Sequence, residues 1–160
     1  MNRVFQMLVV GTLLAVGSGS VAFAAGAADP ALGTWILNLD KSKFTPGPAP
    51  KSQTRTYAQT PDGVALTVTG VAGDGTAISQ QSTFKYDGKD YPITGSADYD
   101  TLSLKRINGS TVKSVQKKSG KFVGTTVRTV SGHGKVLTLT SKGKSATGAA
   151  SHNVAVYDKQ

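Results

Sequence analysis

The chain has 160 residues, a formal net charge of +9 at pH 7, 38% hydrophobic residues and no cysteine. This length suits one domain, and the absence of cysteine excludes disulfides and thiolate metal sites. All nine acidic residues are aspartates, and only Asp158 follows Asp100. The basic C-terminal half would attract anionic polymers or lipids, although lysines on a solvated sheet face give the same pattern.

The N-terminal residues have the order of a cleaved secretory signal. Arg3 provides a short positive start, an apolar run extends from Phe5 to Val16, and small residues lead to Ala22-Phe23-Ala24. These features match the n-region, the h-region and the cleavage site of an export signal. A membrane anchor is the alternative, but glycines and serines interrupt the run before it reaches the length of a spanning helix.

The sequence therefore predicts a signal peptide at 1–24 and a single mature domain at 25–160. The expected mature start is Ala25 or Gly26. We expect a soluble, monomeric protein that is periplasmic or secreted.

After this signal, apolar and polar residues alternate, and no window shows a sustained helical period. Val64, Leu66 and Val68 share one face of such a segment, which is typical of a half-buried strand. Pairs such as Asp87-Gly88 and Asn108-Gly109 favour hairpin turns between the segments. Strands are predicted at about 33–39, 52–60, 63–71, 76–86, 90–95, 100–107, 110–118, 121–130, 135–141 and 149–158.

Ten short strands joined by hairpins indicate an all-β, antiparallel up-and-down meander. Closure into a barrel removes the two exposed edges of such a meander, and a two-sheet β-sandwich is the alternative. The prolines between Asp40 and Pro50 predict a loop that crosses or rims one end of the barrel. Trp35, on the first strand, is expected to be buried at the closed end.

No catalytic constellation is visible in the sequence. There is no Gly-x-Ser-x-Gly elbow, and His133 and His152 have no second histidine or glutamate at ligand spacing. Aromatic residues are too sparse for the stacking platforms of single-strand nucleic-acid binders. We therefore expect no enzyme activity, no cofactor, no metal and no nucleic-acid partner.

Two arginines are candidate ligand-binding residues. Arg106 shares a strand face with Leu102 and Leu104. The face of Arg128 also carries Phe122, Gly124, Thr126 and Val130. If both faces are internal, two guanidinium groups enter the barrel, where buried charges need a partner. The carboxylate of an anionic ligand would supply one; alternatively, strand twist or register turns one or both arginines outward.

The two ends of the chain resemble the calycin group, which includes lipocalins and fatty-acid-binding proteins. Gly33-Thr34-Trp35 is similar to the Gly-x-Trp that opens the first strand in these families, and Val156-Tyr157-Asp158-Lys159 resembles the end of fatty-acid-binding proteins. The resemblance implies an up-and-down barrel around a small apolar ligand and assigns Tyr157 to ligand binding. The family's arginine two positions before this tyrosine is Ala155 here, so Arg106 and Arg128 are only possible substitutes for it. The family's helical lid between the first two strands is also missing.

Other segments are similar to small exported bacterial proteins described as lipocalin-like. These segments are Lys41-Ser42-Lys43-Phe44, the following Pro46-Gly47-Pro48-Ala49-Pro50, and Tyr86-Asp87-Gly88-Lys89-Asp90-Tyr91-Pro92. We therefore expect an exported lipocalin-like protein that binds a small hydrophobic or amphipathic, anionic ligand through Arg106, Arg128 and Tyr157. The alternative is an envelope-associated interaction protein whose basic surface contacts anionic polymers or lipids.

Overall fold

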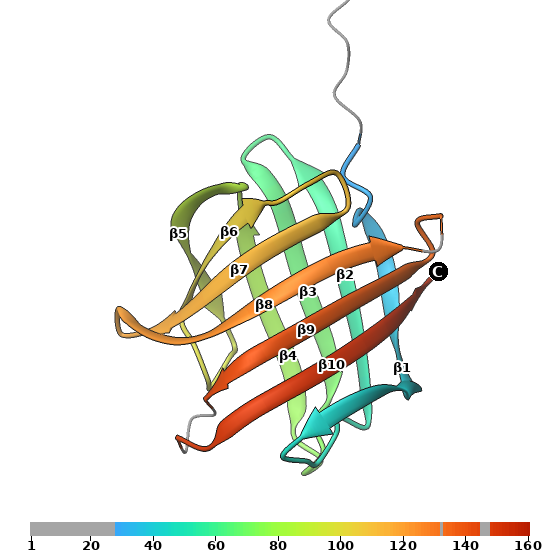
Figure 1. The fold of residues 1–160 in the computed structure, drawn as a ribbon, viewed down its shortest axis with the longest axis vertical. Coiled ribbons are helices and arrows are strands. Elements are labelled where there is room, and N and C mark those ends of the chain that lie inside the picture. The colour runs from blue at the N-terminus through green and yellow to red at the C-terminus, as the bar shows by residue number, and fades with distance from the viewer. Residues whose placement is uncertain (1–27, 132, 145–147) are drawn as a thin grey trace, which may run out of the picture.

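The computed structural model describes residues 28–131, 133–144 and 148–160, so the predicted signal and its cleavage site lie outside the described residues. The described residues form ten strands (Figure 1). They are β1 (Gly33–Thr45), β2 (Ser52–Thr60), β3 (Gly63–Val71), β4 (Ala77–Phe84), β5 (Asp87–Thr94), β6 (Thr101–Arg106), β7 (Thr111–Lys118), β8 (Lys121–Ser131), β9 (Val136–Lys144) and β10 (Ala150–Lys159). No helix in this part of the chain is long and apolar enough to cross a membrane.

The strands form one closed antiparallel barrel. Each strand pairs with its neighbours in sequence, and β1 pairs with β10. Closure gives both terminal strands a partner and so removes the exposed edges of the meander. The predicted barrel is confirmed, the sandwich alternative is wrong, and the architecture fits the calycin-like fold that the two chain ends predict. The shortest ladder joins β4 to β5, where only Gln81 and Ser82 have aligned partners.

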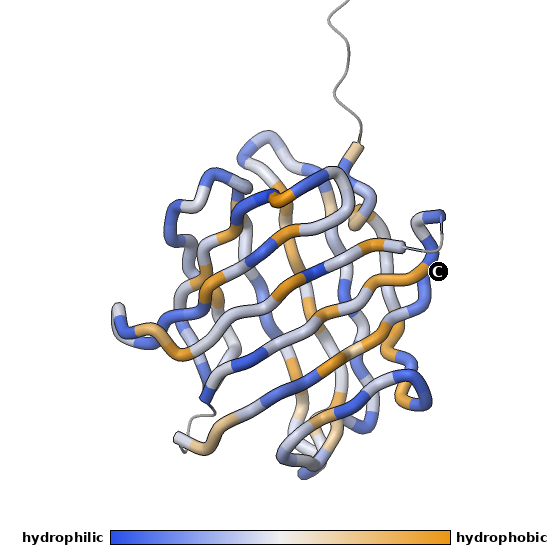
Figure 2. The backbone as a smooth tube through the Cα atoms, in the orientation of Figure 1, coloured by the Kyte–Doolittle hydropathy of each residue, from blue (hydrophilic) through white to orange (hydrophobic). Residues whose placement is uncertain are grey.

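The alternation of side chains places one face of each strand in the lumen. In β3, Val64, Leu66 and Val68 are buried, whereas Thr67 and Thr69 are exposed. Figure 2 shows the same alternation of hydrophobic and hydrophilic residues along many strands. The buried apolar side chains from opposite strands form one core cluster inside the barrel.

The prediction of a loop from Asp40 to Pro50 is wrong for the first half of this segment, which is part of β1. β1 continues to Thr45 and pairs with β10 on both sides of a register shift between Asn38 and Lys43. The Ser42 hydroxyl closes this bulge, because it donates to the carbonyl of Asn38 at 2.6 Å and accepts from the backbone N–H of Val156 at 2.9 Å. The prolines prevent pairing only from position 46 onward, since the residues before them keep their backbone N–H groups.

The Asp87-Gly88 pair also differs from the prediction of a simple turn. It forms the start of β5, and the register with β6 shifts between Asp87 and Asp90. The Asp87 side chain accepts a hydrogen bond from the backbone N–H of Lys89 at 3.0 Å. This local contact bends the chain within the strand, as aspartate commonly does in turns.

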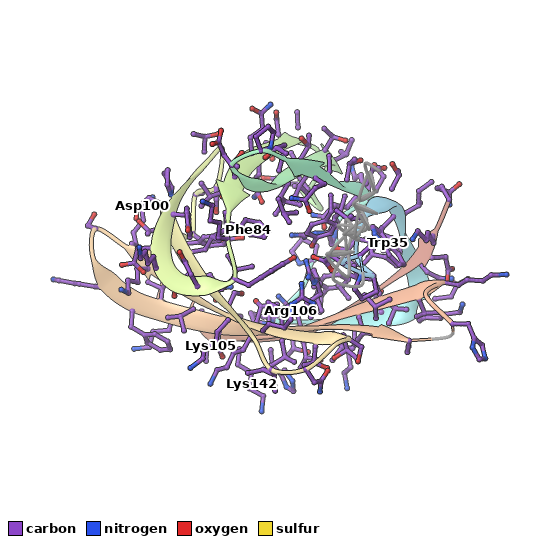
Figure 3. All side chains as sticks on the ribbon, turned by 90° about the horizontal axis from the view of Figure 1, so that it is seen from above. Trp35, Phe84, Asp100, Lys105, Arg106 and Lys142 are labelled. Carbon is purple, nitrogen blue, oxygen red and sulfur yellow. The ribbon has the colours of Figure 1, made fainter. Side chains whose placement is uncertain are left out.

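Trp35 is fully buried where the segment 28–32 enters the barrel (Figure 3). Its indole Nε1 donates a hydrogen bond of 2.7 Å to the carbonyl of Ala31. Ala31 is also fully buried. The Lys159 ammonium lies 5.1 Å from the centre of the indole ring. The predicted burial of Trp35 is confirmed, and its partner is the segment that precedes β1.

We predict that Trp35→Ala lowers the free energy of unfolding by about 3–5 kcal/mol, because it removes a large buried side chain and leaves a cavity. Ile36→Ala is the matched control, since Ile36 is 44% exposed on the opposite face of the same strand. Its effect should be about 0.5 kcal/mol or less. Urea unfolding measures both, and equal midpoints for parent and Trp35→Ala would show that Trp35 does not stabilise this end.

Candidate functional site

Three arginine side chains converge inside the barrel from different strands. Arg55 comes from β2, Arg106 from the end of β6 and Arg128 from β8. The Arg128 side chain is 6% exposed and that of Arg106 is 35% exposed. Figure 3 shows Arg106 pointing into the barrel and Lys105, its neighbour, pointing out. The orientation that the sequence left open is thus inward for Arg106 and Arg128, while their role in ligand binding stays a prediction.

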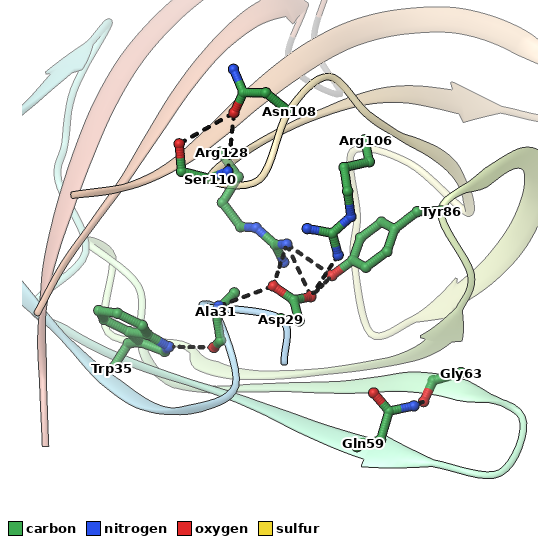
Figure 4. A network of polar contacts seen from close by, with 10 residues as sticks. All are labelled: Asp29, Ala31, Trp35, Gln59, Gly63, Tyr86, Arg106, Asn108, Ser110 and Arg128. Atoms are coloured by element: carbon green, nitrogen blue, oxygen red, sulfur yellow. Dashed lines mark hydrogen bonds and ion pairs between the residues drawn. The ribbon is translucent and has the colours of Figure 1, made fainter. Parts of the chain in front are cut away.

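An internal carboxylate, Asp29, occupies the place that the sequence analysis gave to a ligand (Figure 4). Its Oδ2 atom lies 3.4 Å from Arg128 Nη2 and 3.6 Å from Arg106 Nη2. The Tyr86 hydroxyl donates to the same oxygen and accepts from Arg128 Nη2 at 2.8 Å. The Arg106 guanidinium also packs 4.5 Å from the centre of the Tyr86 ring. Two guanidinium groups and one phenol therefore hold one carboxylate.

The local chain around Asp29 presents its side chain to the barrel. Asp29 Oδ1 accepts from the backbone N–H of Ala31 at 3.0 Å, and the Asp29 carbonyl accepts from the N–H of Leu32 at 3.0 Å. An aspartate that bonds the backbone two residues ahead makes an Asx-turn, here with Pro30 inside it. The turn reverses the chain just before β1, and the Asp29 side chain is 5% exposed.

The surroundings of Asp29 favour its ionised form. Burial raises the pKa of the carboxyl, but the Tyr86 hydrogen bond, the charges of Arg128 and Arg106, and the Ala31 N–H together bring it below its ordinary value of 3.8. Burial, with a contribution from Asp29, raises the pKa of Tyr86 to about 12. At neutral pH the site therefore pairs a carboxylate with a neutral phenol that donates to it.

A second set of polar contacts is centred on Arg55. Arg55 Nη1 donates to Gln53 Oε1 at 3.4 Å, and the Arg55 guanidinium lies 5.8 Å from the centre of the Tyr157 ring. The hydroxyl of Tyr157, which is buried, donates to the same Gln53 oxygen. Tyr157 thus lies in the lumen beside Arg55, and its assignment to ligand binding stays a prediction.

A cavity of about 100 Å³ separates Arg55 from Arg128. Its polar wall is a chain of hydrogen bonds in which Gln116 Nε2 donates to Ser114 Oγ and Thr126 Oγ1, both at 3.0 Å. Its apolar wall consists of Leu66, Phe84, Leu102, Leu104, Val112 and Leu139. At about 30 Å³ per water molecule in the liquid, the cavity has room for a few waters or one small anion.

Several guanidinium atoms at this cavity have no hydrogen-bond partner among the described residues. They are Arg55 Nε, Arg128 Nε and Arg128 Nη1, all buried. No described lining residue is acidic. Burial raises the pKa of Tyr57, but the charges of Arg55 and Arg128, together with hydrogen bonds from both arginines, lower it overall. The cavity therefore favours negative charge.

The prediction that Phe122 shares the lumen face of Arg128 is wrong, because the Phe122 side chain is 66% exposed. The register of β7 and β8 shifts between Gln116 and Lys117, which pair with Gly124 and Phe122. The extra residue, Val123, makes a bulge that turns Phe122 outward, as bulges do when they interrupt the alternation of a strand. Arg128 lies beyond the bulge and keeps its inward orientation.

Sequence reasoning missed Asp29, Arg55 and Tyr86 as site residues. Asp29 lies between the expected cleavage site and the first predicted strand, where no alternation marks it. Arg55 could have been found, because it stands two residues before the aromatic Tyr57 in a predicted strand and so shares its face. No cluster of three or more histidine, aspartate, glutamate or cysteine side chains suited to a metal ion is present in the described residues.

The chain is similar to solved structures of other proteins, two of which are a bile acid-binding protein and a redesigned beta barrel. The zebrafish ileal bile acid-binding protein complexed with cholic acid is 11% identical over 82% of this chain and 99% of its own, with a TM-score of 0.45. The redesigned beta barrel mFAP1 bound to DFHBI is 15% identical over 83% of this chain and 98% of its own, with a TM-score of 0.40. No family model and no curated protein matches the chain. A function must therefore be read from the barrel's own residues.

We predict that Asp29→Asn lowers the free energy of unfolding at pH 7 by about 3–5 kcal/mol, because it leaves buried guanidinium charge without its carboxylate. Since the pKa of Asp29 is lowered on folding, its contribution is present above the ordinary value of 3.8 and disappears as the pH falls through the lower folded value.

Urea unfolding at several pH values measures this difference between parent and variant. The difference should be constant from about pH 7 to pH 5 and shrink below about pH 4. Asp62→Asn, in the exposed β2–β3 turn, is the control and should differ little from the parent. A parent and Asp29→Asn that unfold alike at pH 7 would contradict the assignment.

Proposed function

We propose that this chain is an exported, lipocalin-like binding protein whose barrel holds a small, partly apolar anion of the carboxylate class. The observation that carries the proposal is the set of buried guanidinium nitrogens without partners at Arg55 and Arg128. A buried polar group without a hydrogen bond costs several kcal/mol. Arg128 already shares the carboxylate of Asp29 with Arg106, and an anion in the cavity would supply acceptors for the nitrogens of Arg55 and Arg128 that still lack one.

The geometry of the cavity favours a carboxylate with an apolar part. Guanidinium presents planar, parallel N–H donors that suit the two oxygens of a carboxylate. The same cavity is also lined by Leu66, Leu102 and Leu139, which would contact a hydrocarbon tail. The volume of about 100 Å³ favours a ligand with a short hydrocarbon chain.

A second candidate function is contact with an anionic envelope surface. Strands β6 to β9 carry no acidic residue, and Lys105 stands directly opposite Lys113. Like charges in such a pair repel each other. Asp87, opposite Lys105 on β5, offsets part of this repulsion, and an anionic polymer or lipid would relieve the rest. Lys105 and Lys142 project from the outside of the barrel in Figure 3. Binding through this face should weaken steeply with salt, whereas binding in the lumen should weaken much less.

We predict that residues 25–160 bind hexanoate more tightly than its neutral analogue hexanamide, because only the carboxylate pairs with the arginines. Arg55→Gln should weaken hexanoate binding by about 2–5 kcal/mol. This loss corresponds to a decrease in affinity of about thirtyfold or more. We choose Arg55 for this variant because a substitution of Arg128 would also remove its ion pair with Asp29. Isothermal titration calorimetry measures the affinities.

Lys105→Gln is the control, since it removes one positive charge from the exposed outer face of β6. It should bind hexanoate as the parent does. If the parent binds neither hexanoate nor related carboxylates, or if Arg55→Gln binds hexanoate as well as the parent, the lumen site is wrong and the surface function becomes the better explanation.

A further inference from the structure

The Asp29 carboxylate makes the contacts of a bound ligand. It belongs to the segment 28–32, which precedes the first strand, while the groups that hold it come from the barrel. Arg106 ends β6, Arg128 lies in β8, and Tyr86 connects β4 to β5. The carboxylate thus comes from the segment before the first strand and lies in a cluster of barrel side chains (Figure 4).

One guanidinium group joins this cluster to the inner cavity. Arg128 Nη2 contacts Asp29 and Tyr86, whereas Nε and Nη1 of the same side chain are buried without a partner. A carboxylate that enters the cavity can accept a hydrogen bond from Nη1 and then compete with Asp29 for the charge of Arg128. Charge-assisted bonds of the two carboxylates would be of similar strength.

The space around Asp29 allows such a competition. A second hollow, of about 290 Å³, is lined by Asp29, Tyr86 and Arg106. Phe84 lines both this hollow and the inner cavity of about 100 Å³. Phe84 is itself buried, and the Asp29 side chain lies beside the larger of the two spaces.

We propose that Asp29 is an exchangeable internal ligand, whose carboxylate occupies the Arg106–Arg128–Tyr86 site until a free carboxylate with a longer apolar tail displaces it. This inference rests on the proposed function and extends it to a ligand class, the medium-chain carboxylates. Cleavage at the predicted site would make Asp29 the fourth or fifth residue of the mature chain, so the segment that leaves would be a short free end.

The first test compares the affinity of decanoate for the parent, Asp29→Asn and a matched control. Asp74→Asn is the control, because it removes the same charge from an exposed position in the β3–β4 turn. If Asp29 competes with the ligand, Asp29→Asn should bind decanoate at least tenfold more tightly than the parent. Asp74→Asn should match the parent.

The second test uses the parent protein and so does not depend on the folding of the variant. Trp35 is the single tryptophan, and its Nε1 bonds the carbonyl of Ala31, two residues after Asp29. Displacement of Asp29 should break this bond. Saturating decanoate should therefore change the Trp35 emission and increase amide hydrogen exchange in a peptide that covers Ala31 and Leu32.

The outcomes separate this inference from the proposed function. If the parent binds decanoate while the Trp35 emission and the exchange stay unchanged, or if a folded Asp29→Asn binds it no more tightly, the exchange of Asp29 is wrong and the lumen site stands. If neither protein binds hexanoate or decanoate, both are wrong. If only Asp29→Asn binds decanoate, Asp29 blocks the site in the parent but is not displaced by the ligand, and the exchange of Asp29 is wrong.

Discussion

The need of buried guanidinium groups for negative charge organises the interior of this barrel. Arg106 and Arg128 share the single carboxylate of Asp29, and Tyr86 donates to the same oxygen. Arg55, from the opposite part of the barrel wall, has the Gln53 amide and the faces of tyrosine rings as its neighbours. A buried charge of this kind persists only where its partners compensate the loss of hydration. This constraint explains why Asp29 lies between Arg106 and Arg128, and why the cavity beside Arg55 favours a further negative charge.

Closure of the barrel is what brings these residues together. Residues of β2, β6 and β8 are far apart in the sequence, and they face one another only because β1 pairs with β10. The alternation along each strand then decides which side chains enter the lumen. Leu102, Leu104 and Arg106 enter it together, while Lys105 points away. The same rule brings apolar and cationic side chains together around one small cavity.

Most of the fold could be predicted from alternation and turn residues, because both act over a few neighbouring positions. The site was harder to predict. The faces of Arg106 and Arg128 were identified from their own strands, whereas Phe122 was misplaced because a bulge depends on how two strands pair. The continuation of β1 from Asp40 to Thr45 was missed for the same reason, since a side chain, Ser42, closes its bulge against β10. Asp29 lies outside any periodic segment, and only the assembled barrel shows which charges it meets.

The most direct test of the cationic lumen is a crystal structure of residues 25–160 soaked in bromide, with the ion located by its anomalous scattering. Bromide is a small anion, and the cavity of about 100 Å³ can hold it. We expect an ordered bromide within contact of Arg55 Nε and Arg128 Nη1, the buried nitrogens that lack partners. Bromide found only along the outer lysines, with the cavity empty or filled by water, would contradict an anion site in the barrel.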